Sequence, residues 1–537
     1  LLAEKLTTVE LIALSNTFAV GSVIDTLGYA SNGDGGGARW VKSGISGSTP
    51  SQSPAQKGGA VLSDGSGDVW ALAEGIAAAA LGVDFSDTTD SLAALAAGFG
   101  SALKLTDGTA KVIGQATPAA NTKIDAAGNS KIRFDSTTTA SKVDFNLTSD
   151  NVSFKNISLE HNGIAAENAQ VFDLSASNLY FSRVEIDTNH TAILDHSANA
   201  FHFTDIDAGN IRIENCDIHN VNRIILRSNT NTGNLTNFWF ASNYCYDLGE
   251  GGVQFNFPDP TGVASGIGVV DNYFGGFHGG NEQIFMGGAS VKQAIFSRNI
   301  TQGTAKEAVH LEEKAVDILI SENVFNHDGG GVVLNDTDNG GAGYEKPQRI
   351  SILGNIFSNS GTIGTHTGIA AQEDGTGIDT SDNVIISNNQ LYGYLIGMNL
   401  GFGLELVQNN IITDCVTGIR ANSINPNISG NSISNATTGI SISARGGLIG
   451  KNTFNNVTTL VDLDNAEAVS MTGFIVNLDE DINLPASTTT NINLGIPVGN
   501  KFNGSARVSV FMSSTKYQNS LNTIDYDGAT LTSTEVY

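Results

Sequence analysis

The clearest pattern in the chain is a repeat of alternating apolar and polar residues between Gly403 and Asn465. Three successive segments of 21 residues each place an Asn at the eighth position, at Asn410, Asn431 and Asn452. Apolar residues stand three positions before and two after each Asn. Alternation has the period of a β-strand, and a repeat near 20 residues indicates a solenoid. We therefore predict an all-β fold, a right-handed, single-stranded parallel β-helix with the Asn side chains stacked as an internal ladder.

The Asn recurs towards the N-terminus at wider spacing, between 24 and 34 residues. Those earlier positions are Asn243, Asn272, Asn299, Asn323, Asn355 and Asn389. Three still earlier turns lack the Asn, and we expect their corners at Lys155, Ser182 and Glu214. Because strands have a fixed length, the extra residues must leave as loops, at 256–266, 335–348 and 358–366. Function concentrates in loops on a rigid scaffold, so the site is expected in the middle of the body.

We expect four regions along the chain. Residues 1–67 form an N-terminal segment with a short helix at 8–16 and two strands around a glycine-rich turn at 20–41. Residues 68–116 cap the solenoid, with a helix at 91–98 whose Leu92, Leu95 and Phe99 share one face. Residues 117–465 form the β-helix body. Residues 466–537 form a β-rich region, either a small sandwich or a trimerisation element, and we expect the chain to be a fragment.

The composition of the chain limits the classes of partner that it is expected to bind. The chain has 27 Lys and Arg against 54 Asp and Glu, a net charge of −27. Such a surface repels nucleic acid, and no run of residues is apolar enough for a membrane helix. Cys216 and Cys245 are expected as small core residues two positions after a corner, not as a redox pair. We expect neither a nucleic-acid nor a membrane partner.

Two stretches resemble a known family. The segment TLGYASNGDGGGARW (residues 26–40) resembles the part that precedes the β-helix in bacteriophage tailspike proteins. The segment from Asp68 resembles the cap of a pectate-lyase-like β-helix. The resemblance implies a homotrimer that attaches to the phage tail or baseplate through its N-terminus and acts outside the cell. It also implies depolymerase activity on a bacterial surface polysaccharide.

Candidate site residues come from aligning the strand that follows each corner loop. We expect Ile284 and Val309 to be equivalent inward residues, which makes Glu282 and Glu307 neighbours on successive rungs about 4.8 Å apart. His310 and Glu312 are expected to point outward from the same strand as Glu307. A polar stripe that could bind sugar hydroxyls is predicted beside them, ending next to the long loops. Arg227, Asn256, Asn335 and Gln372 belong to the stripe, and Asp336 and Glu373 align at the far end of the strand. Together with His310 they are the candidate substrate-binding residues.

Adjacent carboxyls predict glycoside hydrolysis. Like charges this close raise one pKa, which supplies a general acid beside an ionised partner. Glu282, Glu307 and Glu312 are the candidate catalytic residues, and an inverting mechanism is expected. His310, Lys314 and Tyr344 keep a polysaccharide lyase open. A non-catalytic receptor-binding fibre would use the same face, and a solvated acidic edge is the structural alternative.

No cofactor is expected. Asp336, Asp338 and Glu373 leave a calcium site open, because the DTDNG run is similar to a calcium loop. That run lacks the later Glu of an EF-hand.

Overall fold

The structure is a computed structural model that divides into two compact units. Unit 1 comprises residues 1–253 and 261–268, and unit 2 comprises residues 254–260 and 269–537. The described residues are 23–25, 39–45, 61–63, 68–72, 76–126, 128–135, 143–162, 169–189, 198–203, 207–221, 223–228, 233–255, 262–277, 284–287, 291–303, 306–311, 315–335, 347–361, 364–372, 383–401, 405–422, 425–443, 448–462, 470–472, 475–476, 481–483 and 507–509.

The N-terminal strands form a small antiparallel sheet in the order β1-β2-β4-β3. They are β1 (Val23–Asp25), β2 (Arg39–Ile45), β3 (Val61–Ser63) and β4 (Asp68–Leu72). Val23 pairs with Val41 and Asp25 with Arg39. The predicted pair of strands flanking the glycine-rich segment is therefore confirmed. The helix expected at 8–16 lies outside the described residues.

The cap begins with β5 (Ile76–Ala77) and a 3-10 turn, η2 (Ala78–Leu81), followed by α2 (Leu92–Ala97). Leu95 and Phe99 are buried, as their shared helical face predicts. The amide of Ser91 donates to the carbonyl of Lys111 at 2.8 Å. The amide of Ile113 donates to the Asp90 carboxylate at 2.9 Å. These bonds attach the helix to the first coil.

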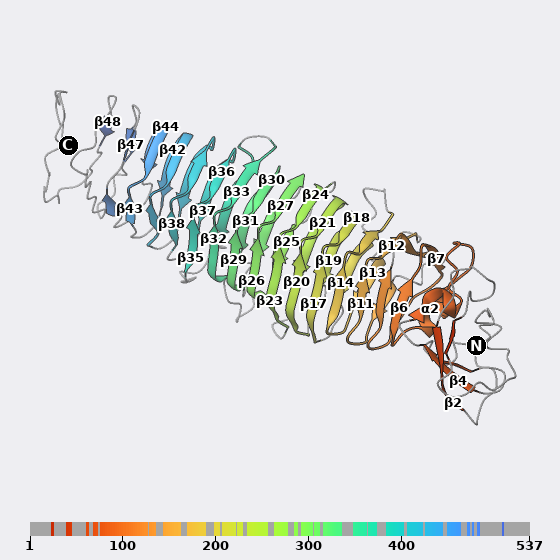
Figure 1. Cartoon of the computed structure of the whole chain (residues 1–537). Coiled ribbons are helices and arrows are strands. Elements are labelled where there is room, and N and C mark those ends of the chain that lie inside the picture. Colours follow the sequence, from red (N-terminus) through yellow and green to blue (C-terminus); the bar gives the residue numbers. More distant parts are fainter. Residues whose placement is uncertain are drawn as a thin grey trace. The chain divides into compact units, whose positions relative to one another are not determined.

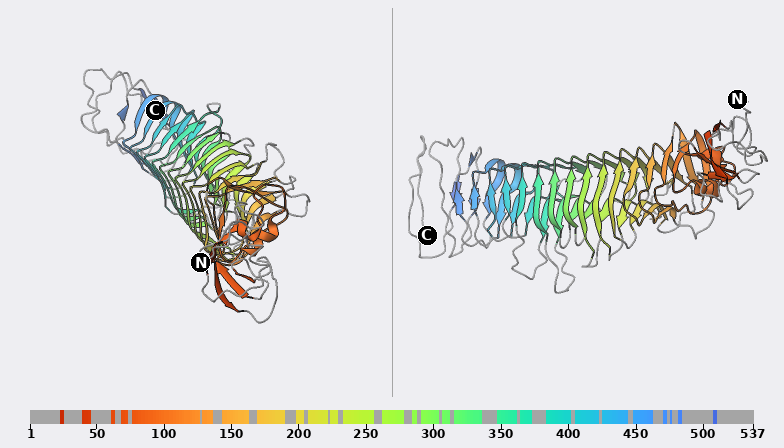
Figure 2. Two further views of the ribbon diagram at one scale, coloured as in Figure 1. Left: turned by 45° about the vertical axis from the view of Figure 1, so that its right-hand side comes forward. Right: turned by 60° about the horizontal axis from the view of Figure 1, so that its bottom comes forward.

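Each complete coil of unit 1 contributes three strands, and each strand pairs in parallel with its equivalents in the neighbouring coils (Figures 1 and 2). The first strands are β6 (Ala102–Leu105), β8 (Lys123–Ala126), β11 (Ser153–Lys155), β14 (Leu179–Ser182), β17 (Ala208–Glu214) and β20 (Leu235–Ala241). The second strands are β7 (Gly108–Val112), β9 (Ser130–Phe134), β12 (Ser158–His161), β15 (Glu185–Asp187), β18 (Asp217–Val221) and β21 (Tyr244–Leu248). The third strands are β10 (Val143–Leu147), β13 (Ala169–Leu174), β16 (Ala198–Phe203) and β19 (Ile224–Ser228). Two further strands, β22 (Gly251–Phe255) and β23 (Ala264–Val270), contain residues of both units.

Unit 2 repeats this arrangement. Its first strands are β26 (Val291–Ser297), β29 (Val316–Ser321), β32 (Gln348–Leu353), β35 (Val384–Ser387), β38 (Leu406–Gln408), β41 (Asn427–Ser429), β43 (Leu448–Gly450) and β45 (Ser470–Thr472). The second strands are β24 (Tyr273–Phe277), β27 (Ile300–Gly303), β30 (Val324–His327), β33 (Ile356–Asn359), β36 (Gln390–Tyr392) and β39 (Ile411–Thr413). The third strands are β25 (Phe285–Gly287), β28 (Glu307–Leu311), β31 (Gly330–Asn335), β34 (Thr367–Gln372), β37 (Ile396–Leu400) and β40 (Thr417–Ala421). Second and third strands merge in β42 (Ser432–Ile442) and β44 (Thr453–Asp462).

The parallel stacking continues past Asn465, where the sequence repeat can no longer be recognised. β45 pairs with β43, and β46 (Ile475–Val476) and β47 (Asp481–Asn483) pair with β44. β48 (Arg507–Ser509) pairs in parallel with β47. The parallel pairing throughout confirms the predicted all-β parallel β-helix.

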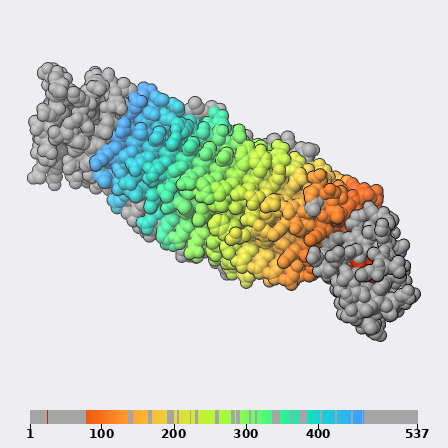
Figure 3. Space-filling model, viewed as in Figure 1, coloured from red at the N-terminus to blue at the C-terminus, as the bar shows by residue number. Residues whose placement is uncertain are grey.

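The core consists of one inward side chain per alternate strand position, stacked on its equivalent in the next coil. Within unit 1 this produces a column of Phe rings with centroids 4.8 to 5.4 Å apart. The rings belong to Phe134, Phe145, Phe154, Phe172, Phe181 and Phe201. Colours change in sequence order within each unit in Figure 3, because each coil packs on the coils before and after it.

The predicted Asn ladder is present at the corner between the first and second strands. In unit 2 it begins at Asn272, whose amide nitrogens donate to Asn299 Oδ1 at 3.0 and 2.9 Å. The same pair of bonds recurs as far as Asn431 and Asn452, both at 3.0 Å. Each Nδ2 from Asn299 onward also donates to a backbone carbonyl of the preceding coil, as Asn431 does to Val407 at 3.0 Å. The ladder thus saturates polar groups that are buried at every corner.

The corners of three early coils differ from the prediction. Ladder positions follow a residue with positive φ, and such residues occur at Asn156, Arg183 and Asn215, with φ of 54°, 53° and 55°. The ladder position is therefore taken by Ile157, Val184 and Cys216, two residues after the corners expected near Lys155, Ser182 and Glu214. The amide of Cys216 donates to Asn243 Oδ1 at 2.9 Å, which confirms this register. Cys216 and Cys245 are buried core residues, as expected, but Cys216 occupies the corner itself.

Replacing a ladder Asn should destabilise the fold. We expect Asn410→Leu or Asn431→Leu to lower the free energy of unfolding by about 1–3 kcal/mol for each buried group left unpaired. Chemical denaturation measures this. Asn422→Leu is the matched control, because Asn422 is exposed and outside the ladder. Equal stability of ladder and control variants would contradict a structural role for the ladder.

Candidate functional site

The structure brings two of the predicted residues together on β28. His310 Nδ1 lies 3.2 Å from Glu307 Oε2, and the two side chains are 8% and 13% exposed. Lys306 Nζ lies 4.0 Å from the other Glu307 oxygen. His310 alternates with the fully buried Val309 and Leu311, as its predicted outward position requires, but its side chain is covered and not open to solvent. The residues in register with it, Met286 and Val333, are apolar.

The alignment that led to the predicted carboxylate pair is wrong by one residue. Phe285, and not Ile284, pairs with Val309. Asn335 and Gln372 are paired strand neighbours, as the predicted polar stripe requires. The other members of the predicted site lie outside the described residues, so they stay predictions. They are Asn256, Glu282, Glu312, Asp336 and Glu373. The residues suggested for calcium, Asp336, Asp338 and Glu373, also lie outside.

Arg227, the remaining predicted residue, lies on β19 of unit 1. It is in register with His202 of β16, which in turn is in register with Asp173 of β13. His202 Nδ1 lies 3.3 Å from the Asp173 carboxylate. Arg227 therefore belongs to a short polar column on the third strands of unit 1.

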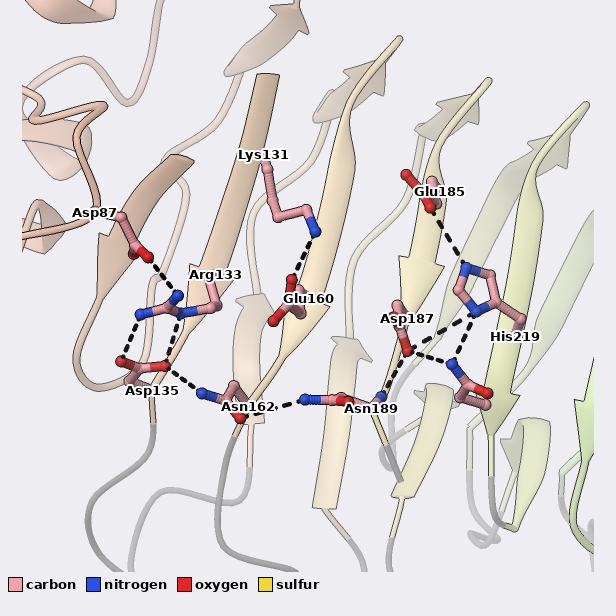
Figure 4. A network of polar contacts seen from close by, with 11 residues as sticks. Asp87, Lys131, Arg133, Asp135, Glu160, Asn162, Glu185, Asp187, Asn189 and His219 are labelled. Atoms are coloured by element: carbon pink, nitrogen blue, oxygen red, sulfur yellow. Dashed lines mark hydrogen bonds and ion pairs between the residues drawn. The ribbon is translucent and has the colours of Figure 1, made fainter. Parts of the chain in front are cut away.

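Sequence reasoning missed a polar cluster that lies on the second strands of unit 1. Two outward columns run across β9, β12, β15, β18 and β21. One contains Lys131, Ser158, Glu185, Asp217 and Tyr244. The other contains Arg133, Glu160, Asp187, His219 and Tyr246. We call these residues the second-strand site, and Figure 4 shows six of them: Lys131, Arg133, Glu160, Glu185, Asp187 and His219.

One end of the second-strand site is cationic. Lys131 Nζ donates to Glu160 Oε2 at 2.6 Å, across adjacent strands. Arg133 donates to Asp135 at 3.0 and 3.2 Å and also to Asp87 of the cap. These hydrogen bonds raise the pKa values of Lys131 and Arg133, so both remain charged. Lys131 and Arg133 thus supply positive charge on an otherwise acidic chain.

The other end centres on His219. Its Nε2 lies 3.4 Å from Glu185 Oε1, and its Nδ1 lies 3.8 Å from Asp187 Oδ1. Asn220 Nδ2 donates to that Asp187 oxygen at 2.8 Å and lies 3.1 Å from His219 Nδ1. The imidazole stacks on the Tyr246 ring, with centroids 4.9 Å apart and 14° between the planes. These contacts hold His219 in one orientation, with Nε2 towards Glu185.

The two adjacent carboxyls Glu185 and Asp217 have opposite pKa shifts. The hydrogen bond with His219 lowers the pKa of Glu185 to about 2. Removal from water, followed in smaller part by the charge of Glu185, raises the pKa of Asp217. Burial lowers the pKa of His219, but the Glu185 bond and the surrounding carboxylates outweigh burial and raise it overall. Two carboxyls with separated pKa values are what general acid–base chemistry requires.

A local sequence signal for this site exists. Glu-Ile-Asp at 185–187, Asp-Ile-His at 217–219 and Tyr-Cys-Tyr at 244–246 each place polar residues around one buried residue. The expected corners at Ser182 and Glu214 share the same two-residue error, which leaves Glu185 aligned with Asp217. The corner at Asn243 carries no such error, so the expected alignment places Tyr246 instead of Tyr244 beside Asp217.

Two expectations from the sequence concern metal ions and membranes. Within the described ranges, no three His, Cys, Asp or Glu side chains lie close enough to hold a metal ion. No helix among the described residues has the length and apolar character that crossing a membrane requires.

Comparison with known proteins finds similarity in structure and none in sequence. No family model matches the chain. No curated protein sequence matches it. The N-terminal fragment of bacteriophage Phi29 gene product 12 is similar at 13% identity and a TM-score of 0.46, over 79% of this chain and 80% of that one.

Two further solved structures are similar. The tailspike of Acinetobacter baumannii phage AM24 has 13% identity and a TM-score of 0.44, over 74% of this chain and 64% of that one. The A-module of the Azotobacter vinelandii mannuronan C-5 epimerase AlgE6 has 14% identity and a TM-score of 0.40, over 74% and 98%. The fold assignment rests on the strand pairing and not on these low scores.

The ion pair between His219 and Glu185 predicts a pH window of stability. Glu185, whose pKa is lowered, stabilises the fold at pH values above its ordinary pKa of 4.5. This stabilisation is lost as the pH falls towards 2. His219, whose pKa is raised, stabilises the fold at pH values below its ordinary pKa of 6.5. This stabilisation is lost as the pH rises through the pKa that His219 has in the folded protein. The stability of the wild-type protein should exceed that of the His219→Gln variant by the largest amount between pH 4.5 and 6.5. Half-exposed pairs contribute at most about 1 kcal/mol.

Thermal melts of the two proteins across pH measure this difference. A difference that does not vary with pH would show that the ion pair contributes nothing. His202→Gln is the control variant, because its partner is Asp173 rather than Glu185.

Proposed function

We propose that the chain binds and cleaves a bacterial surface polysaccharide by glycoside hydrolysis at the second-strand site. The observation that supports this most is the Glu185 and Asp217 pair, paired neighbours on β15 and β18 with opposite pKa shifts. Hydrolysis of a glycosidic bond uses one protonated carboxyl and one carboxylate. The resemblance of the N-terminal segment to tailspike proteins supports the class of substrate.

Each residue has a role in this proposal. Asp217 is the general acid that protonates the leaving oxygen, because its pKa is raised. Glu185 is the carboxylate that attacks the anomeric carbon. Paired strand residues are about 4.8 Å apart, close to the roughly 5–5.5 Å of retaining enzymes. A retaining mechanism is therefore favoured here, in contrast to the inversion expected for the Glu282, Glu307 and Glu312 site. His219 is a positioning residue that keeps Glu185 ionised.

The flanking residues suit a sugar chain. Tyr244, which is 51% exposed, and Tyr246 form a tilted pair with ring centroids 5.1 Å apart. Aromatic rings with polar neighbours are typical of ligand sites. Lys131 and Arg133 offer N–H donors to hydroxyl or carboxylate groups at the other end of the columns.

A polysaccharide lyase is the second candidate function. The stacked His219 and Tyr246 favour it, because a lyase needs a base and an acid beside an acidic sugar. A receptor-binding fibre without turnover would use the same columns. The reaction product distinguishes these functions. Hydrolysis yields saturated ends, elimination yields an unsaturated uronate with ultraviolet absorbance, and binding alone yields neither.

Substitution of the carboxyls tests the proposal. We expect Asp217→Asn and Glu185→Gln each to reduce polysaccharide turnover at least about 10²-fold, on the scale of general acid–base catalysis. Release of reducing ends from host capsule or lipopolysaccharide measures turnover. Glu307→Gln is the matched comparison, because it tests the site predicted from sequence. If only Glu307→Gln loses activity, the reaction takes place at the predicted site and the second-strand site is not catalytic.

The proposed protein acts as a homotrimer on a phage tail, outside the cell, with its N-terminus towards the virion. An uncharged face in unit 2 supports self-association. The first outward column of its second strands contains Tyr273, Ile300, Val324, Ile356, Gln390, Ile411, Ser432 and Thr453. The second column contains Gly275, Gln302, Asn326, Ser358, Tyr392, Thr413, Ser434 and Asn455. No member of either column is charged.

The composition of this face favours a second copy of the chain over a sugar. Two copies each carrying −27 repel one another, so their contact must exclude charge. Ile300, Ile356 and Ile411 are 48%, 36% and 44% exposed. Branched aliphatic side chains offer neither hydrogen bonds nor a flat ring to a sugar, whereas interface cores are depleted in charge.

Introducing charge should therefore dissociate the assembly. We expect the double variant Ile356→Asp and Ile411→Asp to sediment as a monomer while wild type sediments as a trimer. Leu448→Asp is the control, because Leu448 is 38% exposed but lies on a first strand. The variant Ile356→Thr with Ile411→Thr keeps β-branching and checks folding. A trimeric Asp double variant, or a monomeric wild type, would refute this interface.

A further inference from the structure

A second polar surface of unit 1 lies on its first strands, away from the second-strand site. Two outward columns cross β8, β11, β14, β17 and β20. One contains Lys123, Ser153, Tyr180, Arg212 and Trp239. The other contains Asp125, Lys155, Ser182, Glu214 and Ala241. We call this surface the first-strand face.

Trp239 lies flat on this face. A Cβ atom added to Gly268 would lie only 2.4 to 2.8 Å from three atoms of the indole ring. The ring therefore covers the Gly268 backbone with one side and is available to solvent on the other. Its Nε1 donates to Asn237 Oδ1 at 3.3 Å, and Asn237 Nδ2 donates to Asn210 at 2.7 Å. The glycine and the amides fix the ring in place.

Tyr180 provides a second fixed ring two rungs from Trp239, roughly 9.6 Å away along the column. Its hydroxyl donates to Glu214, and Lys155 Nζ lies 5.0 Å from the ring centroid. Both rings are thus preorganised, so a ligand that stacks on them loses little side-chain entropy from the protein.

The two columns of the first-strand face do not share the strong negative charge of the whole chain. They contain the basic residues Lys123, Lys155 and Arg212 and the acidic residues Asp125 and Glu214. Arg212 is exposed, lies in register between Tyr180 and Trp239, and makes no ion pair with any residue that the structure describes. A guanidinium in this position can form paired hydrogen bonds with a carboxylate.

We propose that the first-strand face is a second, non-catalytic binding surface for a carboxylated polysaccharide. A sugar ring stacks on Trp239, a neighbouring carboxylate pairs with Arg212, and Tyr180 supports the chain further along. The proposal rests on the proposed function only in taking the ligand to be a carbohydrate. Two surfaces on one unit hold a long polymer more tightly than either alone, because the second contact is intramolecular.

Tryptophan fluorescence tests this directly, because the chain has only 3 Trp residues. Polygalacturonate, alginate, hyaluronate and polysialic acid serve as acidic probes and dextran as the neutral probe. The Asp217→Asn background limits cleavage during the titration. The signal of Trp239 is the emission of this protein minus that of its Trp239→Phe variant. We expect saturable quenching by at least one acidic polymer, weakened by added salt, and none by dextran.

Arg212→Gln should weaken that binding about tenfold or more, as for a residue at the centre of a contact. Arg420→Gln is the matched control, because Arg420 is an exposed strand Arg of unit 2, and it should leave the affinity unchanged. The proposal is overturned if no acidic polymer quenches Trp239, if Arg212→Gln binds as well as wild type, or if Trp239 emission changes with protein concentration alone. That last result would assign the face to a second copy of the chain.

The two proposals fail separately. If Asp217→Asn and Glu185→Gln keep full turnover while Trp239 still responds, only the catalytic assignment is wrong. If turnover is lost as expected but Trp239 never responds, only the first-strand face is wrong.

Discussion

The structure depends on hydrogen bonding between successive coils, along the strands and at the corners. Parallel pairing satisfies the strand backbone, but a corner leaves buried amides and carbonyls without strand partners. In unit 2 the Asn ladder from Asn272 to Asn452 supplies those partners, with each side chain both donating and accepting. In early coils Ile157, Val184 and Cys216 take the same position. There the positive-φ residue before them shapes the turn and an apolar side chain fills the space.

Once the coils are held in this way, outward residues can vary with little effect on folding, because each faces solvent on a fixed backbone. The second strands illustrate this freedom. In unit 1 their outward residues include Lys131, Glu185, Asp217 and His219, whereas the equivalent columns of unit 2 contain no charge. The same strand type therefore carries charged outward columns in unit 1 and uncharged outward columns in unit 2.

Hydrogen bonding and burial separate the pKa values of neighbouring carboxyls on the second strands of unit 1. The Glu185 carboxylate is stabilised by His219, which leaves Asp217 as the carboxyl that keeps its proton more easily. On the first strands, Arg212 and Trp239 combine positive charge with a fixed ring, without any carboxyl that could serve as an acid beside them in the same column. The two faces of unit 1 therefore differ in residue type, as the separate roles proposed for them require.

The sequence by itself determined the fold, the ladder and the cap helix. A strict 21-residue period, an Asn at each corner and alternating apolar residues are local signals, and each one has a direct structural consequence. The candidate site was decided by the tertiary structure. The coils that separate Glu185, Asp217 and Tyr244 differ in length, so their spacing in the sequence does not show that they are neighbours. Only the strand pairing shows which residues meet. Since side chains alternate, a one-residue error such as Ile284 for Phe285 exchanges the inward and outward residues of a strand.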